Sequence, residues 1–378
     1  MPDKHVLVLG AGFGGLELST QLSRVDGVRT TLIDANECFV FGFSKLDVMI
    51  GRETTDSVRL YYRDFRKDGI EFRQETVTAI DPAARTVTTD KGSYDPDFLV
   101  VALGADYEPD ATPGFVEGGL EFYTLAGAER MREELPSISS GRVLISVLRP
   151  PYKCPPAPYE GTFLLHDMFV ERGVRDAIEM HFINPMPSPI PPSPDTSKAI
   201  LEGFDARSVT YDFGRRVDRL EPSRKVAVLA DGEERTYDYF VGIPKHRVPD
   251  VVEASGLTKN GADGWIHVDP RNLRTPFDGV YAIGDNADAP VPRAGVFAEA
   301  EARVVAEDIA ARVRGDDTDE RFLGRGVCYI EFGGGEVARV NVDFLSGPEP
   351  KAPFTPPSED LMREKYEYAD DRRRTWFS

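Results

Sequence analysis

Apolar strands alternate with amphipathic helical segments along the first part of the chain. Residues 5–9 (HVLVL) are an almost continuous apolar run, which is typical of a strand buried on both faces. A glycine-rich segment follows, and then Leu18, Leu22 and Val25 recur at helical spacing. A second apolar run, TTLID, ends at Asp34. This order of strand, glycine turn, helix and strand predicts a parallel sheet in an α/β fold.

The same alternation returns further along. The runs VLISV (143–147) and IEMHFIN (178–184) predict two more buried strands, and GVYAIGDNAD (279–288) predicts a short strand before a long helical pattern. With 378 residues, 41% of them hydrophobic, the chain is long enough for two or three domains. We therefore predict an α/β protein with two Rossmann-like units. The Pro- and Ser-rich stretch 184–198 predicts a long surface loop between elements of the second unit.

Charge and composition exclude several classes of partner. The net charge is −19, which argues against nucleic acid and against an anionic membrane surface. No run approaches 18 apolar residues and the N-terminus has no signal-peptide pattern, so we expect a cytoplasmic protein with at most peripheral membrane contact. We expect no metal site. Three cysteines in a chain of this length do not make a structural disulfide framework, so a disulfide here is expected to be catalytic.

The glycine turn after the first strand has the spacing of a dinucleotide-binding fingerprint, G-x-G-x-x-G, with an acid at the end of the next strand. In this pattern the first glycine permits a tight turn, the second lets backbone N–H groups approach a pyrophosphate, and the third lets the helix pack on the strand. The acid can accept a hydrogen bond from a ribose hydroxyl. The residues expected to bind the dinucleotide here are Gly10, Gly12, Phe13, Gly14, Gly15 and Asp34.

This first turn leaves FAD and NAD open, and the C-terminal half favours FAD. The strand in GVYAIGDNAD ends in Gly-Asp, and a carboxylate at a strand end can hold a ribitol hydroxyl. The N-terminus of the following helix can face the electron-rich edge of a reduced flavin. The residues expected to contact FAD in this half, and in the intervening FLVVALGAD segment (98–106), are Ala102, Gly104, Gly284, Asp285, Gly295 and Val296.

A second fingerprint is missing where an NAD site would need one. The strand at 143–147 leads into RPPYKCPPAP (149–158), which has five prolines and no glycine. Prolines cannot supply the N–H donors that a second dinucleotide needs. The next strand ends at Asn184 and not at an acid. We therefore expect no ordinary NAD(P) site in the middle of the chain, and Cys154 stands in the position of the missing glycines.

Several motifs resemble the sulfide:quinone oxidoreductases and the related flavocytochrome c sulfide dehydrogenases, over nearly the whole chain. The motif KCPPAPYE is similar to the segment around the first redox cysteine of that family, and GRGVCYIEFGGGEVARV to the segment around the second. VGIPKHRVPDVV (241–252) and GWIHVDPRNLRTPFDGVYAIGD resemble its proline-basic loop and its second flavin motif. The resemblance implies a glutathione-reductase-like flavoprotein that oxidises sulfide through a Cys154–Cys328 disulfide and passes electrons through FAD to a quinone.

The cysteines also have a physical interpretation of their own. A disulfide between them could be attacked by hydrosulfide, leaving a persulfide and a thiolate that can reduce a flavin. Two small buried hydrophobic residues are the alternative. Lys153 and the adjacent helix N-terminus are expected to lower a thiolate pKa. Glu160 matches a glutamate of the family and is a candidate proton carrier; an ordinary first-turn acid is the alternative.

The chain departs from the family pattern at three places. Tyr123 stands where many quinone reductases of the family have a third cysteine. Cys38 lies near the segment that binds flavin covalently in flavocytochromes, but the attachment position aligns closer to Phe41 or Gly42, so we expect noncovalent FAD and a structural Cys38. The aromatic pair at 376–377 near the end of the tail suits a quinone, a membrane interface, or packing onto the body of the protein.

Domain limits and competing functions follow from these motifs. We expect an FAD-binding domain from residues 1–112 and 255–320, a middle domain at 113–254 and a C-terminal segment at 321–378 that carries Cys328. A type II NADH:quinone dehydrogenase shares this fold and is the first alternative function. A flavin-binding redox sensor without turnover is the second. Sulfide or a related small persulfide or thiol is the expected substrate, and a homodimer is left open.

Overall fold

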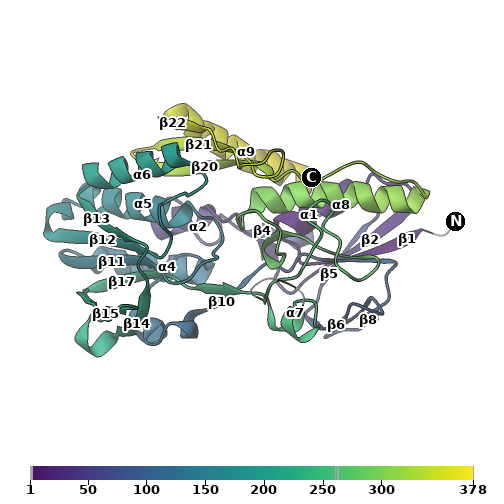
Figure 1. Ribbon diagram of the computed structural model, residues 1–378, viewed down its shortest axis with the longest axis horizontal. Coiled ribbons are helices and arrows are strands. Elements are labelled where there is room, and N and C mark those ends of the chain that lie inside the picture. Colours follow the sequence, from purple (N-terminus) through teal and green to yellow (C-terminus); the bar gives the residue numbers. More distant parts are fainter. Residues whose placement is uncertain (1–2, 260, 262–263, 378) are drawn as a thin grey trace.

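The computed structural model describes residues 3–259, 261 and 264–377. Two α/β lobes lie side by side, and the C-terminal segment crosses over both (Figure 1). The antiparallel pair β10 (Asp106–Glu108) and β18 (Lys245–Arg247) lies between the lobes. The predicted fold class, two Rossmann-like units with a short C-terminal segment, is confirmed.

The first lobe is built on a five-stranded parallel sheet with the order β19-β9-β1-β2-β5. Its central strand carries Val6 to Leu9 with no exposed surface, which explains the continuous apolar run in the sequence. Two helices, α1 and α8, pack on each other beside this sheet. The elements are β1 (Lys4–Leu9), α1 (Phe13–Leu22), β2 (Val28–Asp34), β5 (Ile70–Gln74), β9 (Phe98–Val101), β19 (Val280–Ala282) and α8 (Gly295–Arg314).

The second lobe has a four-stranded parallel sheet with the order β13-β12-β11-β17. Helix α2, which precedes it in sequence, packs in the core of this lobe against α4. The elements are α2 (Ser44–Met49), α4 (Leu125–Glu134), β11 (Gly141–Val147), α5 (Ala157–Glu171), β12 (Ile178–Asn184), α6 (Pro194–Ala206), β13 (Val209–Phe213) and β17 (Tyr239–Ile243).

Short antiparallel strands and two short helices extend both lobes at their edges. In the first lobe these are β3 (Cys38–Phe39), β4 (Leu60–Tyr61), β6 (Val77–Asp81), β7 (Thr86–Thr89), β8 (Ser93–Tyr94) and α7 (Asp250–Ala254). In the second lobe they are α3 (Phe115–Gly118), β14 (Val217–Glu221), β15 (Val226–Leu229) and β16 (Glu234–Thr236).

The C-terminal segment is a three-stranded antiparallel sheet and a long helix: β20 (Arg325–Gly333), β21 (Glu336–Asp343), β22 (Phe354–Ser358) and α9 (Glu359–Phe377). Strand β20 contacts α5 of the second lobe and α8 of the first, and α9 contacts α1. Parts of the chain that are far apart in sequence therefore meet beneath this segment (Figure 1).

The prediction of a surface loop at 184–198 is wrong in two respects. Helix α6 begins at Pro194, a first-turn position that tolerates the missing N–H. Before it, Pro189 and Ser193 are buried, and the Ser193 hydroxyl donates to the Ala352 carbonyl over 2.8 Å. The prolines made the stretch look like a loop, but the C-terminal segment covers it, and sequence spacing does not report that contact.

Candidate redox active site

One cavity of about 810 Å³ lies where the two lobes and the C-terminal segment meet. This volume is in the range of cofactor and small-molecule sites. The wall comes from the β1–α1 turn, the start of α8, the β11–α5 turn, β20 and α9. Of the residues named from sequence, the cavity is lined by Gly12, Phe13, Asp34, Gly104, Cys154, Glu160, Asp285, Gly295, Val296 and Cys328.

The remaining named residues lie behind this wall: Gly10, Gly14, Gly15 and Ala102 support the turn, and Gly284 lines a small pocket beside it. Gly10 has φ +99°, and a Cβ there would lie 2.3 Å from the Ala102 carbonyl oxygen. A Cβ on Gly15 would lie 1.8 Å from the Gly10 oxygen. A Cβ on Gly12 meets no protein atom within 4 Å. Close packing of the backbone therefore requires glycine at positions 10 and 15, whereas the absence of a side chain at Gly12 leaves open space in the cavity.

Asp34 organises the turn from the end of β2. One carboxylate oxygen accepts from the Ala11 N–H over 2.7 Å, and the other accepts from the Asn36 N–H over 2.8 Å. On the opposite side of the turn, the buried Tyr62 hydroxyl donates to the Ala11 carbonyl over 2.6 Å. The acid at the strand end thus has a structural task in addition to its position on the cavity wall.

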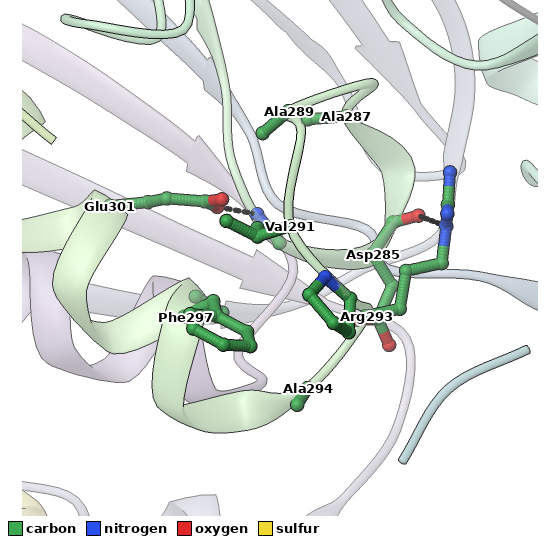
Figure 2. A pocket seen from close by; sticks show the side chains of 11 residues that line it. Asp285, Ala287, Ala289, Val291, Arg293, Ala294, Phe297 and Glu301 are labelled. Atoms are coloured by element: carbon green, nitrogen blue, oxygen red, sulfur yellow. Dashed lines mark hydrogen bonds between the residues drawn. The ribbon is translucent and has the colours of Figure 1, made fainter. Parts of the chain in front are cut away.

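The loop before α8 forms the second wall (Figure 2). Arg293 Nε donates to the Asp285 carbonyl over 3.1 Å, and the Glu301 carboxyl accepts from the Gly284 N–H. Burial raises the pKa of Asp285, and it raises the pKa of Glu301 to about 8. Among the described residues, no side chain caps the start of α8, so its first N–H groups remain available to a ligand in the cavity. Glu301 was missed from sequence, because an acid in a charged helix is ordinary.

The β11–α5 turn presents Cys154 in an unusual conformation. Its φ is +53°, in the left-handed region that non-glycine residues rarely adopt. The Cys154 N–H donates to the Arg293 carbonyl over 2.7 Å, which ties this turn to the loop before α8. Strain of this kind persists only where the surrounding structure holds it, and it is frequent at functional sites.

Both candidate redox cysteines are partly buried thiols in the same wall. Burial, followed by the charge of Glu160, raises the pKa of Cys328 to about 12 and that of Cys154 further. The expected lowering by Lys153 is wrong. Lys153 Nζ donates to the Ala105 carbonyl over 3.1 Å and lies 4.6 Å from the centre of the Tyr107 ring. We predicted Lys153 beside the Cys154 sulfur because the two residues are adjacent in sequence. The strained turn instead directs the Lys153 side chain toward Ala105.

Glu160 lies one turn into α5 and is 2% exposed. One of its carboxylate oxygens accepts from the Glu331 N–H on β20 over 3.0 Å. Burial raises the pKa of Glu160 to about 7, although the charge of Lys365 opposes this effect. The carboxyl can therefore gain and lose a proton near neutral pH, which a proton carrier requires.

Other residues on the wall were not found from sequence. Lys45, on α2, donates from Nζ to the Tyr123 carbonyl over 2.7 Å, and burial lowers its pKa to about 8. Lys365 and Tyr368 reach the cavity from α9. Lys365 and Tyr368 stand in a charged helical pattern that looks solvent-exposed, and Lys45 is a single lysine in a short apolar segment, so no signal in the sequence marks them.

The tail packs onto the first lobe. Trp376 has no exposed surface; its ring centre lies 5.8 Å from that of Phe13 and 6.1 Å from that of Phe41. Of the alternatives predicted for the tail, Trp376 therefore packs onto the body of the protein and does not contact a membrane. Cys38 lines the cavity and is partly buried. Across the described ranges, no helix combines the length and apolar character needed to cross a bilayer.

Comparison with known proteins agrees with this geometry. The pyridine nucleotide-disulphide oxidoreductase family model matches residues 4–145. The mitochondrial sulfide:quinone oxidoreductase of Mus musculus is 23% identical over 376 residues, covering 94% of this chain and 82% of the relative. The crystal structure of the sulfide:quinone oxidoreductase from Aquifex aeolicus superposes with a TM-score of 0.88 at 22% identity, covering 99% of this chain and 92% of that one. This chain is an FAD-dependent oxidoreductase. Its likeness to the sulfide:quinone oxidoreductases, indicated by the motifs, is confirmed.

A third relative is similar over about a third of this chain. The type II NADH:quinone oxidoreductase of Staphylococcus epidermidis (strain RP62A) is 34% identical over 138 residues, covering 35% of this chain and 34% of the relative.

The cavity residues fit FAD. The uncapped start of α1 and the open space at Gly12 suit a pyrophosphate, and the uncapped start of α8 suits the polar edge of a flavin. The same cavity continues to both cysteines.

Proposed function

We propose that this flavoprotein oxidises sulfide at Cys154 and Cys328 and passes the electrons through FAD to a quinone. The observation that supports this most is the single cavity lined by both cysteines and by the dinucleotide-side residues Gly12, Asp34 and Gly295. Similarity to relatives named for sulfide and quinone supports the same substrates.

The proposed chemistry starts from a disulfide between the two cysteines. Hydrosulfide attacks one sulfur, the S–S bond breaks, and a cysteine persulfide (Cys–S–SH) and a thiolate on the other cysteine result. The S–H proton passes to the Glu160 carboxylate, leaving a persulfide anion. The persulfide sulfur then bonds to the other cysteine sulfur, and the two electrons released in forming this Cys–S–S–S–Cys bridge leave the cysteines. The substrate sulfur is oxidised from sulfide to sulfane sulfur.

FAD supplies the two-electron acceptor for this step and the donor for a quinone. We propose that it is held noncovalently, with Gly12 and the start of α1 at the pyrophosphate, Asp34 at a ribose hydroxyl, and Asp285 at the ribitol chain. Residues 1–112 and 255–320 would form its domain, 113–254 the middle domain and 321–378 the segment that brings Cys328. A cytoplasmic location, with at most peripheral membrane contact, belongs to the same proposal.

One other function has an observation in its favour. The similarity to the Staphylococcus epidermidis enzyme supports an NADH:quinone reductase. It is restricted to about a third of the chain, and the turn after β11 offers Pro155 and Pro156 where a second dinucleotide would need N–H donors. Sulfide therefore remains the preferred electron donor.

The deciding experiment is an anaerobic titration of the purified, oxidised flavoprotein with sulfide and, separately, with NADH, followed by flavin absorbance. Bleaching by sulfide and not by NADH is expected. Bleaching by NADH alone would replace the proposal with the NADH:quinone reductase. A decylubiquinone chase of the sulfide-bleached protein tests the acceptor, and return of the oxidised spectrum is the expected result.

A further inference from the structure

The C-terminal helix brings a buried lysine to the redox cavity. Lys365 lines the cavity wall from α9 and is 2% exposed. Its Nζ donates to the Glu331 carboxylate over 3.0 Å and lies 5.1 Å from the centre of the Phe43 ring. A lysine is almost never buried this deeply without a charged partner, so the pair with Glu331 must form as a unit.

Glu331 connects the two elements that carry the cysteines. It lies three residues after Cys328 on β20, and its N–H donates to Glu160 on α5, six residues after Cys154. Its carboxylate also pairs with Arg52, which lies 3.3 Å from Asp47. One hydrogen-bonded network thus joins Lys365, through Glu331, to Glu160, whose charge acts on both cysteines.

The charges in this network do not balance when every group is ionised. Three buried carboxylates face two cations, so one excess negative charge is held away from water. Glu331 is paired with both cations, and they keep its pKa below its usual range against the effect of burial. Among the described residues, the only hydrogen bond that the Glu160 carboxylate accepts comes from the backbone N–H of Glu331. Protonation of Glu160 removes the excess charge.

The charges that act on Glu160 come from three elements: Lys365 from α9, Glu331 from β20 and Asp47 from α2. Burial would lower the pKa of Lys365, but the surrounding carboxylates raise it, so this lysine stays charged. The titratable and charged groups around Glu160 are Lys365 on α9, Glu331 and Cys328 on β20, Asp47 on α2, Arg52 just after α2, Tyr123, and Cys154 before α5.

We propose that Lys365 is a positioning residue for the thiol chemistry: through Glu331 it holds Glu160 between the two cysteine-bearing elements, and its charge makes the Glu160 carboxylate available as a proton acceptor. In the step concerned, an S–H bond of the sulfur substrate or persulfide breaks, an O–H bond forms on Glu160, and the negative charge moves from the carboxylate to sulfur. No electron is transferred. This inference rests on the proposed sulfide oxidation.

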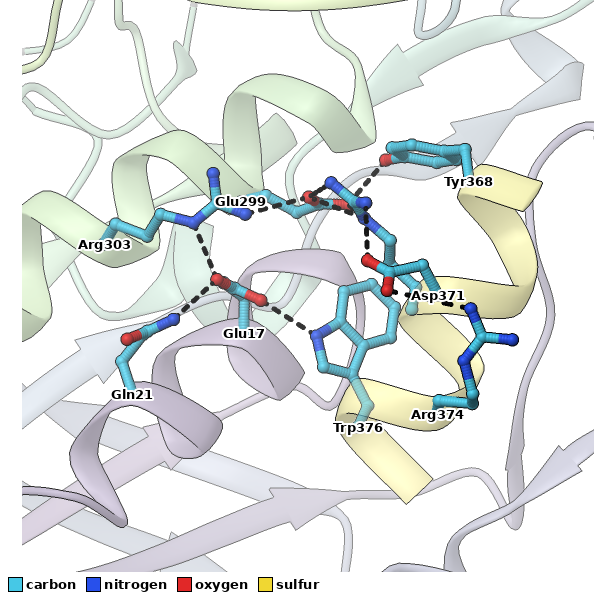
Figure 3. A network of polar contacts seen from close by, with 9 residues as sticks. Glu17, Gln21, Glu299, Arg303, Tyr368, Asp371, Arg374 and Trp376 are labelled. Atoms are coloured by element: carbon cyan, nitrogen blue, oxygen red, sulfur yellow. Dashed lines mark hydrogen bonds and ion pairs between the residues drawn. The ribbon is translucent and has the colours of Figure 1, made fainter. Parts of the chain in front are cut away.

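The position of Lys365 is fixed from a distance by a second network on α9 (Figure 3). Trp376 Nε1 donates to Glu17 on α1 over 2.9 Å, and the Tyr368 hydroxyl donates to Glu299 on α8 over 2.6 Å. Arg372 adds an ion pair of 3.0 Å to Glu299. The helix is therefore docked by contacts that do not involve Lys365, and a substitution at that residue need not release the tail.

The test compares Lys365→Gln with Lys365→Arg in the FAD-loaded full chain. Glutamine keeps a hydrogen-bond donor for Glu331 but removes the charge, whereas arginine keeps the charge. Flavin absorbance, the unfolding midpoint and tryptophan fluorescence show whether each variant is folded with its tail docked. Lys365→Met replaces the glutamine variant if that one does not fold.

The first readout needs no substrate. Infrared difference spectra are recorded between pH 5 and pH 9, and the carboxyl band that disappears in Glu160→Gln reports the titration of Glu160. We expect its midpoint to rise by about one pH unit or more in Lys365→Gln, since the charge of Lys365 acts on Glu160 and a nearby opposite charge shifts a pKa by about 1 to 3 units. In Lys365→Arg the midpoint stays near that of the wild type. An unchanged midpoint in a folded Lys365→Gln variant overturns the inference.

The second readout is the stopped-flow rate of flavin bleaching by sulfide across the same pH range. We expect the rising limb of the Lys365→Gln profile to move to higher pH with the infrared midpoint, giving a loss of about fivefold or more at pH 7, with recovery in Lys365→Arg. If sulfide bleaches neither wild type nor variants while the midpoint still shifts, the proposed function fails and the coupling of Lys365 to Glu160 stands. If sulfide bleaches both equally and the midpoint is unchanged, only the role of Lys365 is lost.

Discussion

The β1–α1 turn and the β11–α5 turn occupy equivalent places in two parallel sheets and have opposite chemistry. In the first, Gly10 takes a positive φ and Gly12 leaves the backbone uncovered. In the second, Cys154 takes the positive φ, and prolines follow it. A strand–turn–helix unit can thus offer backbone N–H groups to a cofactor, or it can remove those donors and present a side chain.

Each turn is held by contacts with the other parts of the site. The first is closed by Asp34 and Tyr62, which bond to the N–H and carbonyl of Ala11. The second is closed by the loop before α8, because the backbone N–H of Cys154 donates a hydrogen bond to the Arg293 carbonyl. We therefore expect substitutions at the first turn to change cofactor binding and substitutions at the second turn to change the sulfur chemistry.

The largest effect is expected when the second turn loses its thiol. Cys154→Ser or Cys328→Ser should reduce the rate of sulfide-driven bleaching by at least about 1,000-fold, because no disulfide remains to be attacked. FAD content and reduction by dithionite should not change. Cys38→Ser is the matched control, since Cys38 lines the same cavity but takes part in no proposed step. Sulfide bleaching that survives in both serine variants would show that the sulfur reacts directly with the flavin.

The next largest effect separates two glycines of the first turn. In Gly15→Ala the new Cβ would lie 1.8 Å from a backbone oxygen, so we expect a loss of about 3 kcal/mol in the free energy of unfolding. In Gly12→Ala the Cβ meets no protein atom, so the apoprotein should unfold within about 0.5 kcal/mol of wild type. FAD affinity should nevertheless fall on the order of tenfold or more. Urea unfolding and FAD titration of both apoproteins measure this, and normal FAD affinity in Gly12→Ala would place the pyrophosphate elsewhere.

The first turn could be predicted from sequence far better than the wall opposite it. Gly10, Gly12, Gly15 and Asp34 act within one strand–turn–helix unit, so their spacing alone describes the geometry. Strands β1, β2, β11, β12 and β19 were found for the same local reason, because each is a largely buried apolar run, whereas β5, β13 and β17 were not predicted.

What sequence could not show depends on contacts between distant segments. Lys365 and Glu331 become a buried pair only because α9 crosses over β20, and the tail alone reads as a charged surface helix. Lys153 was assigned to the sulfur because it precedes Cys154, yet a positive φ at the cysteine and the Ala105 carbonyl direct it away. Tertiary packing buries Lys365 and Glu331 and sets the direction of the Lys153 side chain. Such contacts between distant segments produce no periodic pattern in the sequence.

A smaller effect is expected for Glu160, one turn into the helix that follows the second turn. Burial raises the pKa of Glu160 to about 7, so the fraction ionised, and with it the rate of sulfide-driven bleaching, should rise as the pH increases through about 7. Glu160→Gln should lower this rate by about 100-fold at pH 8 and remove the part of the pH dependence that belongs to the protein. The ionisation of sulfide itself remains in the variant and serves as the internal control. A variant profile parallel to that of wild type would assign Glu160 to the helix dipole only.

The smallest effect tests the strain at Cys154 directly. A left-handed conformation costs a residue with a Cβ about 1 to 2 kcal/mol, and glycine escapes this cost but loses more conformational entropy on folding, by about 0.5 to 1 kcal/mol. Cys154→Gly and Cys154→Ala both remove the thiol, so their difference isolates the backbone term. We expect the glycine variant to be more stable by up to about 1 kcal/mol in urea unfolding of the FAD-loaded protein. If alanine is the more stable of the two, the turn relaxes without its sulfur, and the positive φ is then a consequence of the thiol's own packing and not of the frame formed by Arg293 and the start of α5.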